Sequence, residues 1–153
     1  MLATWAADCA ERVLPLFEKV HHADDRPRKA IEVCRTWTKT GVFSMPVIRG
    51  ASLAAHSAAR EVKQNKAGCF AAHAAGQAVA TAHVPQHAYG AAYYALKAVI
   101  AAAPDLAEIN ALQEWEWELK NASPGLRKEV FQRIIIQKNG TRITIKINKE
   151  GDF

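Results

Sequence analysis

Carboxylate side chains are almost missing from the middle of this sequence, where Glu61 is the only Asp or Glu between residues 51 and 104. A two-metal hydrolytic site needs clustered acids, so no such site is expected there. The sequence also lacks a nucleophile elbow, a phosphate-binding glycine loop, a dinucleotide-binding fingerprint and an EF-hand loop. We therefore expect no catalytic residues and no enzymatic activity.

Cysteines are few and widely spaced. The chain has three of them, Cys9, Cys34 and Cys69, and no two form a CxxC pair. Each lies in an apolar or alanine-rich helical pattern, which favours buried, reduced thiols that pack as small hydrophobic groups. Because HExxH motifs and Cys/His clusters are also missing, we expect no metal and no other cofactor.

Long apolar runs are missing as well. The best candidate, residues 88 to 103, is shorter than the roughly 20 residues of a membrane span and contains Lys97. Asp8 and Glu11 interrupt the N-terminus before any apolar run could serve as a signal sequence. We expect a cytoplasmic protein that makes no membrane contact.

Charge is distributed unevenly along the chain, whose 153 residues carry a formal net charge of +5. Residues 105 to 118 contain five acids and no Lys or Arg, whereas residues 119 to 153 contain eight basic and three acidic side chains. An acidic helix next to a basic tail favours contacts inside the molecule over a nucleic-acid-binding face. No nucleic acid partner is expected.

Helical periodicity is the dominant pattern that the sequence does contain. Between Trp5 and Val20, apolar residues recur at steps of three and four, as on an amphipathic helix. Similar patterns predict helices over residues 2–20 (with a kink or restart at Pro15), 24–41, 51–65, 67–84, 87–103, 106–122 and 126–132. Residues 42–50 are expected to form a connecting loop. Helices of this length with short loops predict an all-α fold, with six to seven antiparallel helices in a bundle or a short helical-repeat array.

The C-terminal part alternates between apolar and polar residues, which predicts a β-hairpin over residues 133–147. A type I′ turn at Asn139-Gly140 would place Ile136 opposite Ile143 and Ile134 opposite Ile145. We expect an α-helical domain over residues 1–132, with the hairpin and tail, 133–153, packed on it. The alternatives are a last helix that extends through Ile136, or a hairpin that pairs with a second copy in a homodimer.

Alanine supplies 21 of the 53 residues from 51 to 103, so backbones there can approach below the usual helix spacing of about 8 to 10 Å. Gly76 and Gly90 would permit still closer approach. At such distances a buried imidazole can hydrogen-bond a neighbouring helix, and Pro85 separates His83 from His87, so those two do not share one helix face. We interpret the histidines as packing partners; a ligand site is the alternative.

Two further stretches carry charge in a pattern that suits binding. In "DDRPRKAIE", a helix cap and ion pairs explain most of the residues, but two arginines beside a fixed turn could also hold an anion or a partner's carboxylates. In "QEWEWELK", two tryptophans lie on roughly opposite sides of a helix, so one of them could form an aromatic and acidic partner surface. This candidate surface consists of Glu114, Trp115, Glu116 and Trp117. The alternative is that the hairpin or the basic tail covers it.

Four stretches carry a resemblance to a known family: "WAADCAERVLPLFE" (5–18), "DRPRKAIEVCRTW" (25–37), "AAHSAARE" (54–61) and "AAGQAVATAHVPQHAYGAAYYALKA" (74–98). In this order they resemble the immunity-family-five-like group of bacterial polymorphic toxin systems, over most of residues 5 to 98. The resemblance implies an all-helical domain that neutralises a cognate protein toxin by binding it, without a reaction of its own. The matching stretches indicate a shared polar set for binding: Asp25, Arg26, Arg28, His56, Arg60, His73, Gln77, His83 and His87.

Two other functions stay open on the residues alone. One is a helical domain that binds a small ligand or a metal through the histidines at 56, 73, 83 and 87. The other is a structural module that forms homo-oligomers through the isoleucine face of the hairpin.

Overall fold

A computed structural model describes residues 1–148 and Glu150 of the chain. Over these residues the chain forms seven α-helices, a short 3₁₀-helix and one two-stranded hairpin, which confirms the predicted all-α class. The elements are α1 (Leu2–Glu18), α2 (Arg26–Thr40), α3 (Met45–Glu61), α4 (Lys66–Ala80), α5 (His87–Ala102), η1 (Pro104–Leu106), α6 (Ala107–Asn121), α7 (Pro124–Arg133), β1 (Ile134–Asn139) and β2 (Arg142–Ile147). None of the described helices has the length and apolar character needed to cross a membrane.

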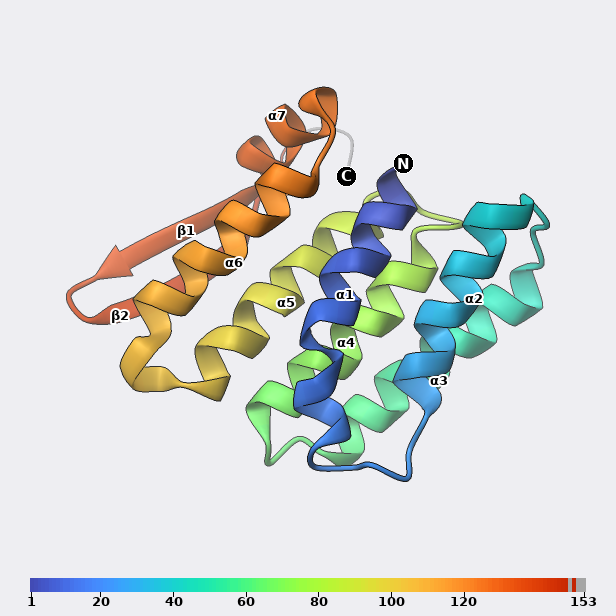
Figure 1. Ribbon diagram of the computed structural model, residues 1–153, viewed down its shortest axis with the longest axis horizontal. Helices are drawn as coiled ribbons and strands as arrows, with labels where there is room; N and C mark the ends of the chain where they lie inside the picture. Colours follow the sequence, from blue (N-terminus) through green and yellow to red (C-terminus); the bar gives the residue numbers. More distant parts are fainter. Residues whose placement is uncertain (149, 151–153) are drawn as a thin grey trace.

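The helices run back and forth along one another, with α1 and α4 near the centre of the molecule (Figure 1). Helices α2 and α3 lie on one side of this centre, and α5, α6 and the hairpin lie on the other. α4 contacts α1, α2, α3 and α5. It can do so because its buried face consists mainly of alanine, with fully buried positions such as Ala71, Ala75 and Ala78. Small side chains on the buried part of α4 let these four helices pack closely against it.

The ends of the first helices follow from local chemistry, with one difference from prediction. Gly41 ends α2 in a left-handed conformation (φ 70°), as predicted. Asp25 occupies the N-cap position of α2, while the carboxylate of Asp24 accepts a hydrogen bond from the Arg26 amide at 3.1 Å. The expected restart at Pro15 does not occur, because α1 continues through that residue as one helix.

The start of α3 was predicted wrongly. This helix begins at Met45, within the stretch predicted as a loop, and Pro46 fits its first turn because proline has no amide hydrogen to satisfy there. Ser52 therefore lies inside the helix, where its hydroxyl donates to the Gly76 carbonyl at 3.0 Å. Gly50, within the stretch predicted as a loop, is an exposed position inside α3.

The hairpin is present, but its predicted register is wrong by two residues. Ile134 pairs with Ile147, Ile136 with Ile145, and Asn139 with Arg142. The loop is therefore Gly140-Thr141, with Gly140 (φ 62°) at the first central position, where type II′ turns take glycine. A type I′ turn would require Asn139 at positive φ, and no described non-glycine residue has one. A shift of two keeps every isoleucine on its predicted face.

The hairpin packs on the helices with that isoleucine face. Ile134 and Ile145 are 3% and 8% exposed and belong to the same hydrophobic core as α1, α4 and α5. α7 ends at Arg133, so the alternative of a helix extending through Ile136 is wrong. Ile136 and Ile143 on the same face are partly buried against this core.

Candidate functional site

The structure divides the polar residues proposed from the sequence between two places. One group lies where α2 begins: Asp25, Arg26 and Arg28. The other lies on α3, α4, α5 and the loop before α5: His56, Arg60, His73, Gln77, His83 and His87.

The group at the start of α2 forms ion pairs that join three helix ends. Arg26 Nη2 lies 2.6 Å from Asp24 Oδ2 and 2.7 Å from Glu61 Oε2 at the end of α3. Arg28 Nη2 lies 2.5 Å from Glu18 Oε1 at the end of α1. The hydrogen bonds from Arg26 hold the pKa values of the Asp24 and Glu61 carboxyls below their ordinary range. These arginines are occupied by the chain's own carboxylates, which fits a structural role.

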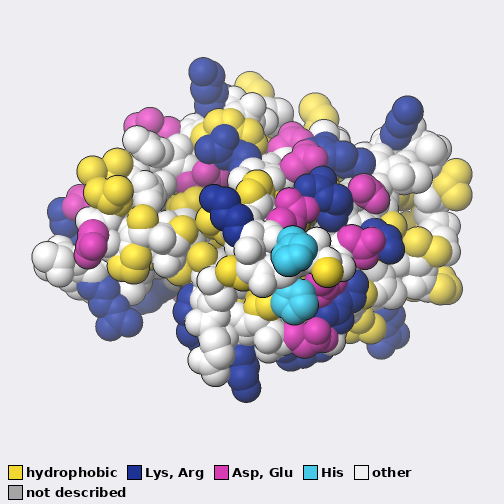
Figure 2. Space-filling view, turned by 60° about the horizontal axis from the view of Figure 1, so that its bottom comes forward, with side chains coloured by type: hydrophobic (Ala, Val, Ile, Leu, Met, Phe, Trp, Pro, Cys, Tyr) yellow, Lys and Arg dark blue, Asp and Glu magenta, His cyan; other side chains and the backbone are white. Residues whose placement is uncertain are grey.

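Figure 2 brings this end of the bundle forward and shows acidic and basic side chains interspersed beside exposed histidines. Lys29 adds an ion pair with Asp25 within the same helix, at 2.9 Å. Exposed pairs of this kind contribute roughly 0 to 1 kcal/mol each. The acidic and basic side chains at the start of α2 are therefore paired with one another.

The second group begins with a contact between two imidazoles. His56 Nδ1 on α3 and His73 Nδ1 on α4 are 2.7 Å apart, so one ring donates its N–H and the other accepts. Gly76 makes room for this contact, because a Cβ at that position would lie 2.8 Å from the His56 ring. On its other side, His73 stacks on Tyr94 of α5 with ring centroids 5.0 Å apart. Three helices are thus connected through aromatic rings.

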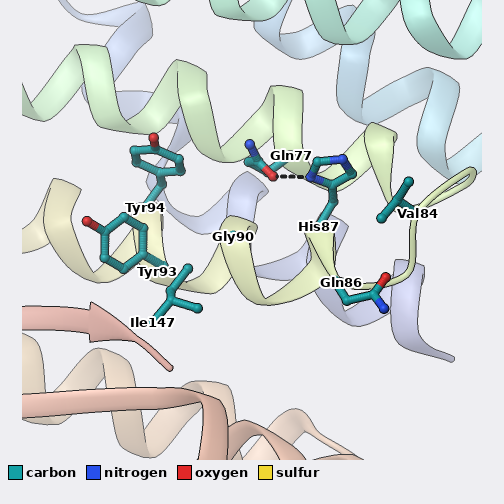
Figure 3. A pocket seen from close by; sticks show the side chains of 8 residues that line it. All are labelled: Gln77, Val84, Gln86, His87, Gly90, Tyr93, Tyr94 and Ile147. Carbon is teal, nitrogen blue, oxygen red and sulfur yellow. Dashed lines mark hydrogen bonds between the residues drawn. The ribbon is translucent and has the colours of Figure 1, made fainter. Parts of the chain in front are cut away.

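A second contact lies nearer the start of α5. His87 Nδ1 and Gln77 Oε1 are 2.7 Å apart, and since an amide oxygen can only accept, Nδ1 carries the proton and donates it (Figure 3). Gly90 accommodates the Gln77 side chain, because a Cβ there would lie 2.6 Å from Oε1. The ring of His83 lies 5.5 Å from that of His87. Both glycines singled out in the sequence therefore make space for a polar side chain from the neighbouring helix.

Lys97 completes the row of polar groups on α5. Its Nζ donates to the Tyr93 hydroxyl at 3.2 Å and lies 4.3 Å from the ring centroid of Phe70 on α4. Tyr93 and Tyr94 meet edge to face, with centroids 5.1 Å apart. A cation held over aromatic rings in this way is fixed in position.

Burial and neighbouring positive charge lower the pKa values of the imidazoles of His56, His73 and His87. Burial lowers the pKa of His73 to about 4, and the charges of His56, Arg60 and Lys97 act in the same direction. Burial also lowers the pKa of His56, with Arg60 next in importance, and lowers that of His87. These three imidazoles therefore act as neutral hydrogen-bond donors and acceptors, and the positive charge near them is carried by Arg60 and Lys97.

These residues form one surface, because those on α3 and on α4 recur at helical spacing and side-chain contacts connect α3 to α4 and α4 to α5. We call it the α3–α5 face and define it by the following residues: Arg49, Leu53, His56 and Arg60 on α3; Lys66, Phe70, His73 and Gln77 on α4; and His87, Tyr93, Tyr94 and Lys97 on α5. Most of its imidazole, tyrosine and amide side chains are half-buried, whereas Arg49, Arg60 and Lys66 are exposed.

A cavity of about 540 Å³ opens at the α5 end of this face. Gln77, His87, Tyr93 and Tyr94 line it, and Ile147 from β2 forms part of its wall. In Figure 3 the two tyrosines lie toward one end of the cavity, and Gln77 and His87 lie toward the other. The cavity thus combines aromatic rings with hydrogen-bonding groups.

The histidines do not converge as a metal site would require. His56 bonds His73 and His87 bonds Gln77, so the imidazoles are used in separate contacts. Within residues 1–148 and Glu150, no group of three or more His, Cys, Asp or Glu side chains is placed to hold a metal ion. The arrangement suits recognition by hydrogen bonding and stacking.

The acidic and aromatic stretch of α6 is largely engaged inside the fold. Glu114 is 4% exposed and accepts hydrogen bonds from Arg12 Nε at 3.1 Å, and the Arg12 guanidinium lies 4.2 Å from the Trp117 ring centroid. Trp115 packs against Phe131 of α7. Of the four residues proposed as a partner surface, Glu116 is exposed, Trp115 and Trp117 are half-buried, and Glu114 is buried.

Sequence reasoning missed the aromatic half of the α3–α5 face. Phe70, Tyr93, Tyr94 and Lys97 were not among the proposed site residues. A signal was present, because residues 66, 70, 73 and 77 recur at helical steps within otherwise small side chains. The same spacing links positions 87, 94 and 97.

Comparison with known protein families matches residues 1–123 to the family described as "Imm-5 like putative immunity protein". The chain belongs to this Imm-5-like family. Neither the curated proteins nor the solved structures include a match to this chain. The Imm-5-like match contains every residue of the α3–α5 face, whereas α7 and the hairpin, with Ile147, lie outside it.

Proposed function

We propose that this protein is an immunity protein that neutralises a cognate toxin by binding it directly, without a catalytic step. The observation that carries the proposal is the Imm-5-like match over residues 1–123, which takes in the helices from α1 to α6. The absence of clustered carboxylates from residues 51 to 104 also favours binding over hydrolysis. The side chains on α3, α4 and α5 that are ordered by contacts within the chain also support a preformed binding surface.

The proposal is tested by producing the chain together with the toxin encoded beside its gene. Cells that make both proteins should grow, and cells that make the toxin alone should not. With purified components, toxin activity should fall in proportion to added protein and vanish at about one equivalent, as binding without turnover requires. Failure to protect would refute the immunity role. Inactivation of a large excess of toxin by a trace of this protein would refute binding as the mechanism.

A further inference from the structure

We infer that the α3–α5 face is the surface that receives the toxin, and that its complement is an acidic protein surface. The inference rests on the proposed function and adds to it the location of the interface and the chemistry of the partner. Four kinds of observation carry it: the charge of the face, its aromatic composition, its internal order and the cavity at one end.

The charge of the face has one sign. From residue 33 to residue 104, Glu61 is the only Asp or Glu, and its carboxylate is bonded to Arg26 at the end of the bundle. Four cations are spread over the face, and they are Arg49, Arg60, Lys66 and Lys97. Unlike the arginines at the start of α2, these cations have no carboxylate of their own face to pair with. Carboxylates of a partner would form ion pairs with these cations and would steer the partner's approach.

The composition of the face matches that of protein–protein interfaces. Its uncharged part consists mainly of Tyr, Phe, His and Leu, and Leu53 is 55% exposed. Aromatic side chains and arginine are the residues that contribute most to protein–protein affinity when a partner covers them. Leu53, His56 and Arg60 lie on consecutive turns of α3, so one partner surface could cover all three.

The side chains of the face are already ordered by contacts within the chain. The bond between His56 and His73, the stacking of His73 on Tyr94 and the bond between Gln77 and His87 each fix a side chain. A partner that binds there loses little free energy to side-chain ordering, because the ordering has occurred on folding.

The cavity gives the face an anchoring point for one acidic side chain. The Tyr93 oxygen accepts a hydrogen bond from Lys97, which leaves the Tyr93 O–H free to donate to an incoming carboxylate. Val84 and Ile147 supply apolar walls for the methylene groups of that side chain. Ile147 belongs to the hairpin, outside the Imm-5-like match, so the hairpin adds one wall to a site formed by family residues.

A nucleic acid is the less favoured occupant. Phosphate backbones require closely spaced cations that follow a groove, whereas here the cations are separated by neutral imidazoles and tyrosines. The separated cations suit carboxylates that are scattered over a folded protein surface.

The test uses two double charge reversals of exposed residues, which change the net charge equally. Arg49→Glu with Arg60→Glu alters the face, and Lys120→Glu with Lys128→Glu alters α6 and α7 as the control. All variants keep the full chain, and circular dichroism verifies that each is folded. The probe is the toxin encoded beside the gene, carrying a substitution that removes its activity, and its Kd is measured by titration calorimetry at two salt concentrations.

We expect the face variant to weaken binding by about 100-fold or more and to lose most of the salt dependence, with the control within about threefold of wild type. Tyr93→Phe, which removes only the hydroxyl, should weaken binding by about tenfold. Hydrogen exchange of the complex should slow in residues 49–60, 66–77 and 87–97. A face variant that binds like wild type would overturn the inference, while the wild-type Kd would still support the proposed function. Absence of wild-type binding would refute the proposed function itself, and tight binding of single-stranded RNA instead of toxin would overturn both.

Discussion

Glu118 is a carboxyl group held inside the protein without a hydrogen-bond partner. Its side chain is 0% exposed, and neither carboxylate oxygen has a partner among the described residues. Burial raises the pKa of Glu118 well above its ordinary value of 4.5, and the negative charge of Glu114 acts in the same direction. The unfolded chain releases this proton near pH 4.5, so the folded state loses stability as pH rises from there toward the folded pKa.

Replacing Glu118 by Gln should therefore stabilise the protein at neutral pH. We expect the free energy of unfolding at pH 7.5 to rise by about 1 to 3 kcal/mol, because the variant has no carboxyl to keep protonated or to ionise in the interior. Urea denaturation at pH 7.5 and pH 4 measures this, and the difference from wild type should shrink toward pH 4. Glu116→Gln on the exposed side of α6 is the control, expected within about 0.5 kcal/mol of wild type. Equal effects of the two substitutions would contradict this account of Glu118.

Gly76 and Gly50 are both inside helices, but their surroundings differ. A Cβ at Gly76 would lie 2.8 Å from the His56 ring, whereas a Cβ at Gly50 would meet nothing within 4 Å. Alanine gains up to about 1 kcal/mol of helix propensity over glycine at either position. We expect Gly50→Ala to raise stability by up to that amount, and Gly76→Ala to lower it by about 1 to 3 kcal/mol because His56 must move away from His73. Thermal unfolding of both variants provides the comparison, and a stabilising Gly76→Ala would show that the imidazoles can rearrange freely.

At the scale of the elements, the sequence predicted what local chemistry determines. The helix ends at Gly41 and near Pro104 follow from glycine and proline geometry, and both are observed. The start of α3 was missed because Pro46 and Gly50 are residues typical of loops, whereas here proline fits the first turn of the helix and the exposed glycine is tolerated inside it. The hairpin register was missed because two glycine turns of equal loop length fit the same alternation, and backbone φ values decide between them. Cross-helix contacts such as His73 to Tyr94 depend on tertiary packing, which no single helix reveals.

The hairpin should contribute to stability through one of its faces. Ile145 on β2 is 8% exposed and packs into the core, whereas Ile135 on β1 is 38% exposed. Ile145→Thr should lower the free energy of unfolding by about 1 to 3 kcal/mol, because it leaves a void and buries a hydroxyl. Ile135→Thr keeps strand propensity on the outer side and should change stability by about 0.5 kcal/mol or less. Chemical denaturation distinguishes the two, and equal losses would indicate that the outer face of the hairpin is also covered in solution.

At the scale of the whole molecule, the regions differ in whether their charged side chains are paired, buried or left without an opposite charge. Around the start of α2, opposite charges neutralise one another in ion pairs, and in α6 two carboxyls are turned inward toward α1. On the α3–α5 face, cations stand beside neutral imidazoles. Protonation of those imidazoles would add positive charge where Arg60 and Lys97 already lie. The stability of the molecule in mild acid therefore depends on two opposing groups, the imidazoles of the face and Glu118 in the interior.

The two contributions have opposite signs between pH 4.5 and 6.5. The folded pKa of His73 is about 4 against an ordinary value of 6.5. The unfolded chain thus takes up a proton first, and stability falls as pH falls through this window. Glu118 acts in reverse, because its folded pKa is raised and stability increases as pH falls. The pKa values of Asp24 and Glu61 are lowered in the folded state, so these carboxyls also reduce stability as pH falls, but only at the acid end of the window, where the unfolded carboxyls begin to take up protons.

Removing one contribution should expose the other. In Glu118→Gln, stability should decline steadily from pH 6.5 to pH 4.5, by less than about 1.4 kcal/mol per pH unit for each half-exposed imidazole. In His73→Gln, the decline should be smaller than in wild type, since His56 and His87 continue to act while Glu118 opposes them. Urea denaturation at half-unit pH steps and constant ionic strength yields the three curves. If the free energy of unfolding has the same pH slope in all three proteins, neither group controls the acid response. The neutral state of the imidazoles on the α3–α5 face would then need another explanation.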